Sequence, residues 1–165
     1  MKTIIFVRHA KSHWGNPDLS DFDRPLNKRG LRDAPFMADL IASKGIKPDL
    51  IISSPANRAI TTAKYFAKAL NYDKEQIEQI NLIYTSGIIS IMELIASLDS
   101  QYNTVMLFGH NPVISSLVYK LSEGKVSEMP TCAVACIDFE IENWIELNEA
   151  EGKLRFFEYP KKYKE

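Results

Sequence analysis

Four cationic or titratable side chains stand in sequence contexts that suit the binding and transfer of a phosphoryl group. They are Arg8 and His9, which directly follow an apolar run, Arg58 in the segment SSPANRAITTA, and His110 in the segment GHNP. Guanidinium groups bind phosphoryl oxygens through pairs of parallel hydrogen bonds. A neutral imidazole can attack phosphorus and form a covalent phosphohistidine. If the fold brings the four together, we expect His9 to be the nucleophile and the other three to bind the phosphate and stabilise its charge.

The protonation state of His9 decides whether it can attack phosphorus. Two nearby arginines disfavour its cationic form, so we expect His9 to be neutral near pH 7. Taken singly, the residues allow plainer interpretations. A histidine at a strand end is more often structural, and Arg58 alone is typical of a helix surface. The functional hypothesis therefore depends on all of them meeting at one place.

A metal site is the alternative use of these histidines. His9 and His13 have the i, i+4 spacing of a metal-binding helix, but Trp14, Gly15 and Pro17 disfavour a helix there. The third histidine lies far along the chain in a phosphate-type context. We therefore expect no metal ion and no other cofactor.

The elements that must position these residues alternate between β-branched runs and segments of helical period. The expected strands are Thr3–Val7, Leu50–Ile52, Gln79–Ile83 and Thr104–Phe108. The expected helices carry the apolar stripes Leu31/Ala34/Met37/Ala38/Ile41, Ala59/Ala63/Phe66/Leu70, Ile91/Leu94/Ile95/Leu98 and Ile114/Leu117/Val118/Leu121. Pro35 should lie in the first turn of its helix or kink it. Because ligands bind beyond the carboxyl ends of parallel strands, the residues that follow each strand should share one edge of the sheet.

Two helix starts are expected at that same edge. Ser54 and Asn111 are typical N-caps, and the prolines that follow them, Pro55 and Pro112, are typical first helical residues. The N-termini of both helices would then add their free N–H groups to an anion site.

The fold class that follows is α/β. We expect a single domain over residues 1–165 with three α/β/α layers and a mostly parallel central sheet of about six strands. The alternating segment Ala133–Ile141 and the segment Leu154–Tyr159 should form an antiparallel pair that closes the sheet.

A long irregular stretch follows His9, from Ala10 to about Asn27. A loop of this length inside a compact domain is usually functional or disordered. Its aspartates, Asp18, Asp21 and Asp23, could supply a general acid. They could equally be turn-forming residues, with Asp21 or Asp23 paired to Arg24.

Composition excludes several classes of function. The 165-residue chain has a net charge of −1 and a pI of about 6.3, so no bulk positive field exists to bind nucleic acid. No apolar run approaches the ~20 residues that span a bilayer. We expect a cytoplasmic protein that does not bind membranes and is a monomer or weak dimer.

Together these motifs resemble the histidine phosphatase superfamily, which has the phosphoglycerate mutase-like fold. The matching segments are Arg8-His9-Ala10, DFDRPLNKRG at 21–30, SSPANRAITTA at 53–63 and GHNP at 109–112. The ordered set resembles the short SixA-type branch of phosphohistidine phosphatases. The resemblance implies that His9 becomes phosphorylated and that Arg8, Arg58 and His110 form the phosphate pocket.

Two departures from the family pattern bear on the substrate. Ala10 replaces the usual glycine, and the region Asn81–Gly87 lacks the proton-donating glutamate of larger relatives. Without a placed acid, a phosphohistidine in a protein suits the site better than a sugar phosphate, because imidazole leaves more easily than an alkoxide.

Two other functions stay open. One is a phosphomonoesterase for small phosphorylated metabolites that uses a loop aspartate as its acid. The other is a non-catalytic phosphate-binding module, which the presence of His9 beside both arginines argues against. A phosphoglycerate mutase is disfavoured because the chain is short and the acid is missing.

Overall fold

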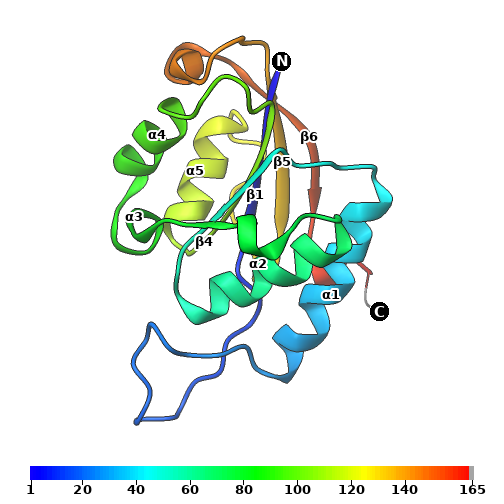
Figure 1. Ribbon diagram of the computed structural model, residues 1–165, viewed down its shortest axis with the longest axis vertical. Helices are drawn as coiled ribbons and strands as arrows, with labels where there is room; N and C mark the ends of the chain where they lie inside the picture. Colours follow the sequence, from blue (N-terminus) through cyan, green and yellow to red (C-terminus); the bar gives the residue numbers. More distant parts are fainter. Residues whose placement is uncertain (164–165) are drawn as a thin grey trace.

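The computed structural model describes residues 1–163, which form a six-stranded mixed sheet covered by helices on both faces (Figure 1). The strand order is β3-β2-β4-β1-β5-β6. The strands are β1 (Lys2–Arg8), β2 (Leu50–Ser53), β3 (Glu78–Gln79), β4 (Thr104–Gly109), β5 (Val134–Phe139) and β6 (Gly152–Glu158). Strands β1 to β4 pair in parallel, whereas β5 pairs antiparallel with both β1 and β6. The expected α/β fold, with its antiparallel C-terminal pair, is confirmed.

Residues 1–163 also form five α-helices and three short 3-10 helices. The α-helices are α1 (Lys28–Ser43), α2 (Asn57–Ala69), α3 (Asn81–Thr85), α4 (Ile88–Ala96) and α5 (Val113–Leu121). The 3-10 helices are η1 (Lys74–Gln76), η2 (Trp144–Glu149) and η3 (Pro160–Tyr163). No helix among the described residues is long and apolar enough to cross a membrane.

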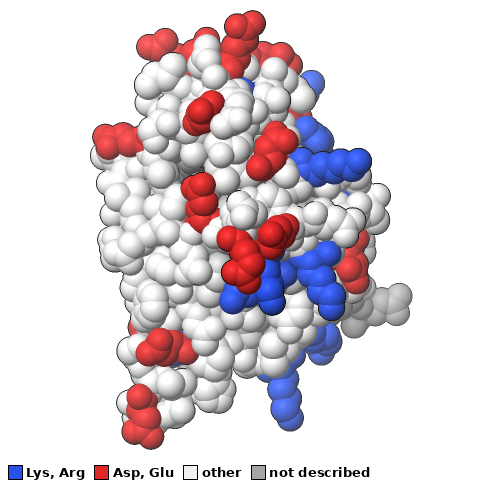
Figure 2. Space-filling model, viewed as in Figure 1, with Lys and Arg blue, Asp and Glu red and all other residues white. Residues whose placement is uncertain are grey.

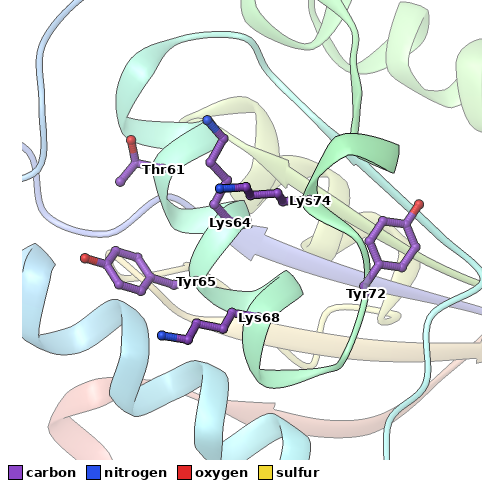
Figure 3. A pocket seen from close by; sticks show the side chains of 6 residues that line it. All are labelled: Thr61, Lys64, Tyr65, Lys68, Tyr72 and Lys74. Carbon is purple, nitrogen blue, oxygen red and sulfur yellow. The ribbon is translucent and has the colours of Figure 1, made fainter.

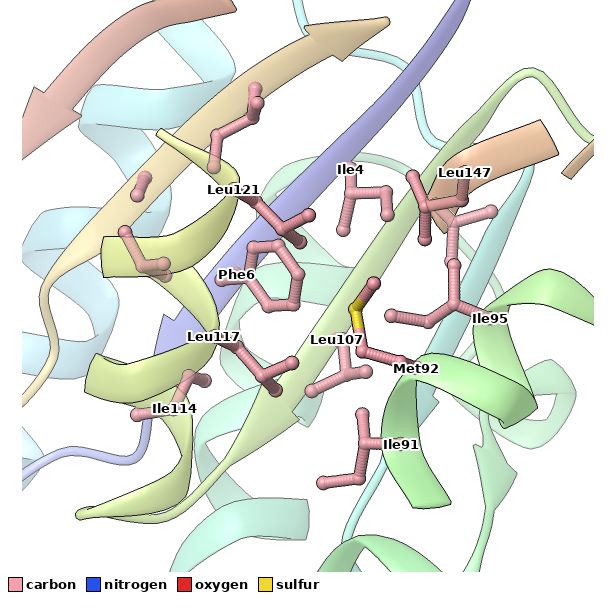
Figure 4. Packing of buried hydrophobic residues seen from close by; sticks show 14 of the residues in the cluster. Ile4, Phe6, Ile91, Met92, Ile95, Leu107, Ile114, Leu117, Leu121 and Leu147 are labelled. Carbon is pink, nitrogen blue, oxygen red and sulfur yellow. The ribbon is translucent and has the colours of Figure 1, made fainter. Parts of the chain in front are cut away.

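The core has two halves because successive side chains of β1 point to opposite faces of the sheet. Ile4 and Phe6 pack on the face covered by α4 and α5, as Figure 4 shows. Ile5 and Val7 pack on the opposite face, which α1 and α2 cover. With both faces of β1 buried, the strand is a rigid support for the residues at its carboxyl end.

The prediction of a third strand over Gln79–Ile83 was wrong in the residues that it included. Strand β3 contains only Glu78 and Gln79, and residues 81–85 form helix α3 instead. The Ile80 N–H donates to the Ser53 carbonyl at 2.9 Å and the chain then turns away. Ile80 and Ile83 both face the core three residues apart, which is helical rather than strand spacing.

Several helix details also differ from expectation. Leu31 is 47% exposed and does not belong to the buried stripe of α1, and Pro35 lies in the interior of that helix rather than in its first turn. Helix α2 begins at Asn57 with Ala56 as its N-cap. Helix α5 begins at Val113 with Pro112 as its N-cap.

Candidate active site

The register between β1 and β4 brings Arg8, His9 and His110 together. Arg8 is aligned with Gly109 across the two parallel strands, and the His9 N–H donates to the Gly109 carbonyl at 3.1 Å. The imidazole centroids of His9 and His110 are 5.1 Å apart. Arg58 reaches the same edge from the first turn of α2, which follows β2. All four sequence-predicted residues therefore lie at one end of the sheet.

The tautomer of His9 follows from a single hydrogen bond. Nδ1 of His9 lies 2.7 Å from the carbonyl oxygen of Ala10. A carbonyl can only accept, so Nδ1 must carry the proton and donate it. The neutral ring then has its free lone pair on Nε2. This is the nitrogen that can attack phosphorus.

Burial keeps His9 in that neutral form. The residue is 7% exposed, and desolvation lowers its pKa to about 3, although the bond to Ala10 acts in the opposite direction. The charges of His110, Arg58 and Arg8 make smaller contributions to the same lowering of the pKa. The sequence correctly predicted a neutral His9 at pH 7, but it attributed this state to the nearby arginines alone. Burial, and not the arginines, is the largest contribution.

His110 is held by Ser54, which was expected only as a helix cap. Its Nε2 lies 2.8 Å from the Ser54 hydroxyl, and that hydroxyl already accepts from the Ala56 N–H. The Ser54 O–H is thus free to donate to Nε2, which would place the ring proton of His110 on Nδ1. Burial, with the charge of Arg58, lowers the pKa of His110 to about 4.

Three buried nitrogens of this group have no hydrogen-bond partner within residues 1–163. They are Nε of Arg8, Nε of Arg58 and Nδ1 of His110. Buried polar groups are nearly always hydrogen-bonded, because leaving one unpaired costs roughly 1–3 kcal/mol. Unpaired donors on three neighbouring side chains are typical of a site that is completed by a bound oxyanion.

The long loop contributes Asp21 to the site. Arg58 donates from Nη1 to the Asp21 carbonyl at 2.7 Å and from Nη2 to its carboxylate at 3.0 Å. Tyr84 donates its hydroxyl to the same carboxylate at 2.8 Å, and Arg24 binds the other carboxylate oxygen. Asp21 is thus the loop aspartate that pairs with Arg24. Asp23 instead accepts a hydrogen bond from Ser20.

Asp21 is ionised in this arrangement. Partial burial acts to raise its pKa, but the hydrogen bonds from Tyr84, Arg24 and Arg58 outweigh that effect and lower the pKa to about 2. The carboxylate consequently holds no proton to donate at neutral pH. Its contacts anchor the loop and orient the Arg58 guanidinium.

Sequence reasoning did not identify two further residues at this site. Tyr84 lies in the region without carboxylates and contacts the edge of His110, with ring centroids 5.6 Å apart. Thr62 links the segment that follows β1 to helix α2, because its hydroxyl accepts from the Ala10 N–H and donates to the Arg58 carbonyl. The i, i+4 spacing of Thr62 from Arg58 was the available signal for Thr62. No local pattern indicated Tyr84, since its partner Asp21 is 63 residues away.

The described residues contain no group of three or more His, Cys, Asp or Glu side chains that could hold a metal ion. The titratable side chains at this site are instead paired with other groups: His9 with the Ala10 carbonyl, His110 with the Ser54 hydroxyl, and Asp21 with Arg58, Arg24 and Tyr84. The arrangement is suited to binding an anion directly.

Comparison with known proteins places this geometry in a family. The model for the histidine phosphatase superfamily (branch 1) matches residues 4–82. A crystal structure of the protein assigned as phosphohistidine phosphatase SixA of Agrobacterium tumefaciens is 30% identical, covers 96% of this chain and 98% of its own, and superposes with a TM-score of 0.82. The chain belongs to the histidine phosphatase superfamily. Within it, the chain is of the SixA type, and it is a phosphatase.

Two other relatives extend the comparison. An uncharacterised chloroplastic protein of Arabidopsis thaliana is 30% identical over 92% of this chain and 72% of its own length. A protein histidine phosphatase SixA solved with tungstate shares the fold at a TM-score of 0.83 and 20% identity, covering 98% of this chain and 99% of that one.

The buried state of His9 gives a first prediction. In a pH titration followed by long-range ¹H–¹⁵N NMR of the imidazole nitrogens, His9 should stay neutral, with its proton on Nδ1, down to about pH 4, since its pKa is about 3. A lowered pKa means that protonation begins only near that value, so the histidine is neutral at every higher pH. The exposed His13 is the internal comparison. A His9 midpoint near 6.5, or a proton on Nε2, would contradict the structure.

Proposed function

We propose that this protein is a metal-independent phosphohistidine phosphatase that removes phosphate from histidine side chains of a phosphorylated protein. The observation that carries the proposal is the neutral His9, with its lone pair on Nε2, beside three buried and unpaired donors on Arg8, Arg58 and His110. A nucleophile surrounded by unsatisfied donors suits phosphoryl transfer, which depends mainly on positioning and charge stabilisation.

The proposed reaction has two steps. Nε2 of His9 attacks the phosphorus while the N–P bond to the substrate histidine breaks, and the departing imidazole takes a proton from solvent. Water then attacks the phosphorylated His9, which releases inorganic phosphate and restores the neutral ring. In both steps Arg8, Arg58 and His110 would donate to the equatorial oxygens.

The nature of the available acids supports phosphohistidine over an alkyl ester. The region that holds a glutamate in larger relatives here presents Tyr84, and the hydrogen bond to Asp21 raises the pKa of that phenol. Asp21 itself is ionised. An alkoxide needs a proton as it leaves, and a placed acid typically contributes 10²–10⁴-fold, whereas imidazole can be protonated by water.

The alternative is a phosphomonoesterase for small metabolites with Asp21 as its acid. The one observation that favours this alternative is the position of Asp21, whose carboxylate forms an ion pair with Arg58 at the site. A non-catalytic phosphate-binding module would not need the neutral, correctly protonated His9. We retain phosphohistidine hydrolysis as the main proposal, without nucleic acid or membrane as a partner.

Leaving-group dependence tests the choice between these enzymes. Rates should be high on a phosphohistidine peptide and on aryl phosphates, and lower on alkyl phosphates by roughly the 10²–10⁴-fold that a general acid supplies. Asp21→Asn should change phosphohistidine turnover little, with Asp23→Asn as the matched loop control. If alkyl esters react as fast as aryl esters and Asp21→Asn alone slows them by about 10²-fold, Asp21 is the acid and the small-molecule function is correct. EDTA should leave all of these rates unchanged.

A further inference from the structure

A hollow of about 600 Å³ lies along the outer side of α2, outside the catalytic site. Its lining residues are Thr61, Lys64, Tyr65, Lys68, Tyr72 and Lys74. Figure 3 shows that Lys64 and Lys68 come from α2, whereas Lys74 comes from η1. Two separate elements thus bring three ammonium groups to one concave surface.

These three lysines are not neutralised by the protein. Lys64, Lys68 and Lys74 are exposed, and none of them forms an ion pair or a side-chain hydrogen bond with another residue in the range 1–163. By contrast, Lys44 and Lys162 both pair with Glu158. Three lysines without an ion-pair partner in the described part of the chain therefore surround one hollow.

Basic and acidic side chains lie next to one another on this part of the surface. Figure 2 shows several Lys and Arg side chains over the region where α2 and η1 lie in Figure 1, with acidic side chains in contact with them. Asp73 and Glu75 flank Lys74 in the sequence, and the Asp73 carboxylate caps η1 by accepting from the Glu75 N–H, but neither carboxylate forms an ion pair with Lys74 within residues 1–163. The lysines therefore remain available to an external anion.

Helix α2 connects this hollow to the catalytic site. Arg58 lies in its first turn, and Lys64 and Lys68 follow at roughly 9 and 15 Å along the axis, at about 1.5 Å per residue. Thr61, at the near end of the hollow, donates its hydroxyl to Asn57, whose N–H in turn donates to Phe22 of the catalytic loop. A protein interface of ordinary size covers about 800 Å² per partner, enough to span both places.

We infer that the lysine hollow is a docking surface for an acidic segment of the protein whose phosphohistidine enters the active site. This inference rests on the proposed function and names a feature of its substrate. The segment would pair its carboxylates with Lys64, Lys68 and Lys74. Because an extended chain advances about 3.3 Å per residue, the acidic residues should lie roughly three to five positions from the phosphohistidine.

The test uses two peptides that carry a non-hydrolysable phosphohistidine analogue. One has glutamates at the third to fifth positions on both sides of the analogue, and the other has glutamines at the same positions. Binding to the full-length protein is measured by fluorescence anisotropy. The glutamate peptide should bind more tightly at low salt because it can form ion pairs with the three lysines. Each exposed ion pair is weak, so the expected gain in affinity is only about tenfold. The preference should vanish near 1 M salt, where the Debye length is only about 3 Å.

Charge reversal identifies the surface. In the Lys64→Glu/Lys68→Glu/Lys74→Glu variant the preference for glutamate should be lost or inverted, while turnover of an aryl phosphate should be unchanged. The matched control reverses Lys47, Lys120 and Lys125, which are exposed and lie outside the hollow, and it should keep the preference. Equal binding of both peptides by the unmodified protein, or an unchanged preference in the charge-reversed variant, overturns the inference.

The two levels of the proposal can fail separately. Hydrolysable versions of the same peptides report the proposed function directly. If the glutamate peptide binds through the lysines but neither phosphohistidine peptide is hydrolysed, the docking surface stands and the phosphohistidine phosphatase function is wrong. If both peptides are hydrolysed at equal rates and bound equally, the function stands and the docking surface is wrong.

Discussion

Replacing His9 with alanine should abolish turnover of both phosphohistidine and aryl phosphates. The substitution removes the only group proposed to form a bond to phosphorus, so neither step of the reaction can proceed through the enzyme. Loss of a catalytic nucleophile lowers kcat by at least roughly 10⁴-fold in enzymes of this kind. Steady-state assays, corrected for spontaneous phosphohistidine hydrolysis, measure the effect.

Two further variants separate chemistry from folding. His9 is buried, so its removal could also disturb packing, and His9→Gln provides a larger replacement that keeps a polar side chain in the space. His13→Ala is the matched control because His13 is exposed in the adjoining loop. Near-normal turnover by His9→Ala or His9→Gln, with unchanged thermal unfolding, would show that another residue attacks phosphorus.

The second large effect should come from Arg58→Ala. This change removes an unpaired, buried donor and a positive charge from the proposed phosphate pocket. A preorganised group of this type contributes on the order of 2.7–4 kcal/mol to transition-state stabilisation, which corresponds to about 10²–10³ in kcat. Inhibition by tungstate or vanadate should weaken in parallel, because both oxyanions would use the same donors.

Arg58 also holds the loop through Asp21, and a matched variant isolates that role. Asp21→Asn removes the same ion pair but keeps the Arg58 guanidinium in the protein. If Arg58 acts on phosphate, Asp21→Asn should be far less damaging to phosphohistidine turnover than Arg58→Ala. Equal losses in the two variants would mean that Arg58 serves mainly to fix the loop.

The meeting of Arg8, His9, Arg58 and His110 could be predicted because each lies at or just beyond the carboxyl end of a strand. Parallel strands end at a common edge, so the order of elements alone places the residues that come next. The continuous apolar runs of β1 and β4 made those strands recognisable, and burial on both faces is the reason for such runs.

The third strand could not be predicted in this way. Its two residues, Glu78 and Gln79, are both exposed and carry no strand signal, while the apolar residues that followed them belong to a helix. A short edge strand is determined by its partner, here β2, and not by its own side chains. The local pattern of apolar and polar residues therefore does not predict such a strand.

The contribution of Asp21 also lay beyond the sequence. Three aspartates in one loop look alike, and only tertiary contacts with Arg58 and Tyr84 distinguish Asp21 from the others. The extent to which the pKa of His9 is lowered could not be predicted from the sequence for a similar reason. Desolvation depends on everything that packs around a side chain, whereas neighbouring charges can be counted from motifs.

Trapping of the intermediate tests the central claim most directly. The enzyme is mixed with an aryl phosphate labelled with ³²P, quenched rapidly in base during turnover, digested and mapped. The account predicts label on the peptide that contains His9, in a form that is stable in base and lost in acid, and no label in His9→Gln. Label on a different residue, or turnover without any labelled protein while a burst of product is seen, would contradict a phosphohistidine intermediate at His9.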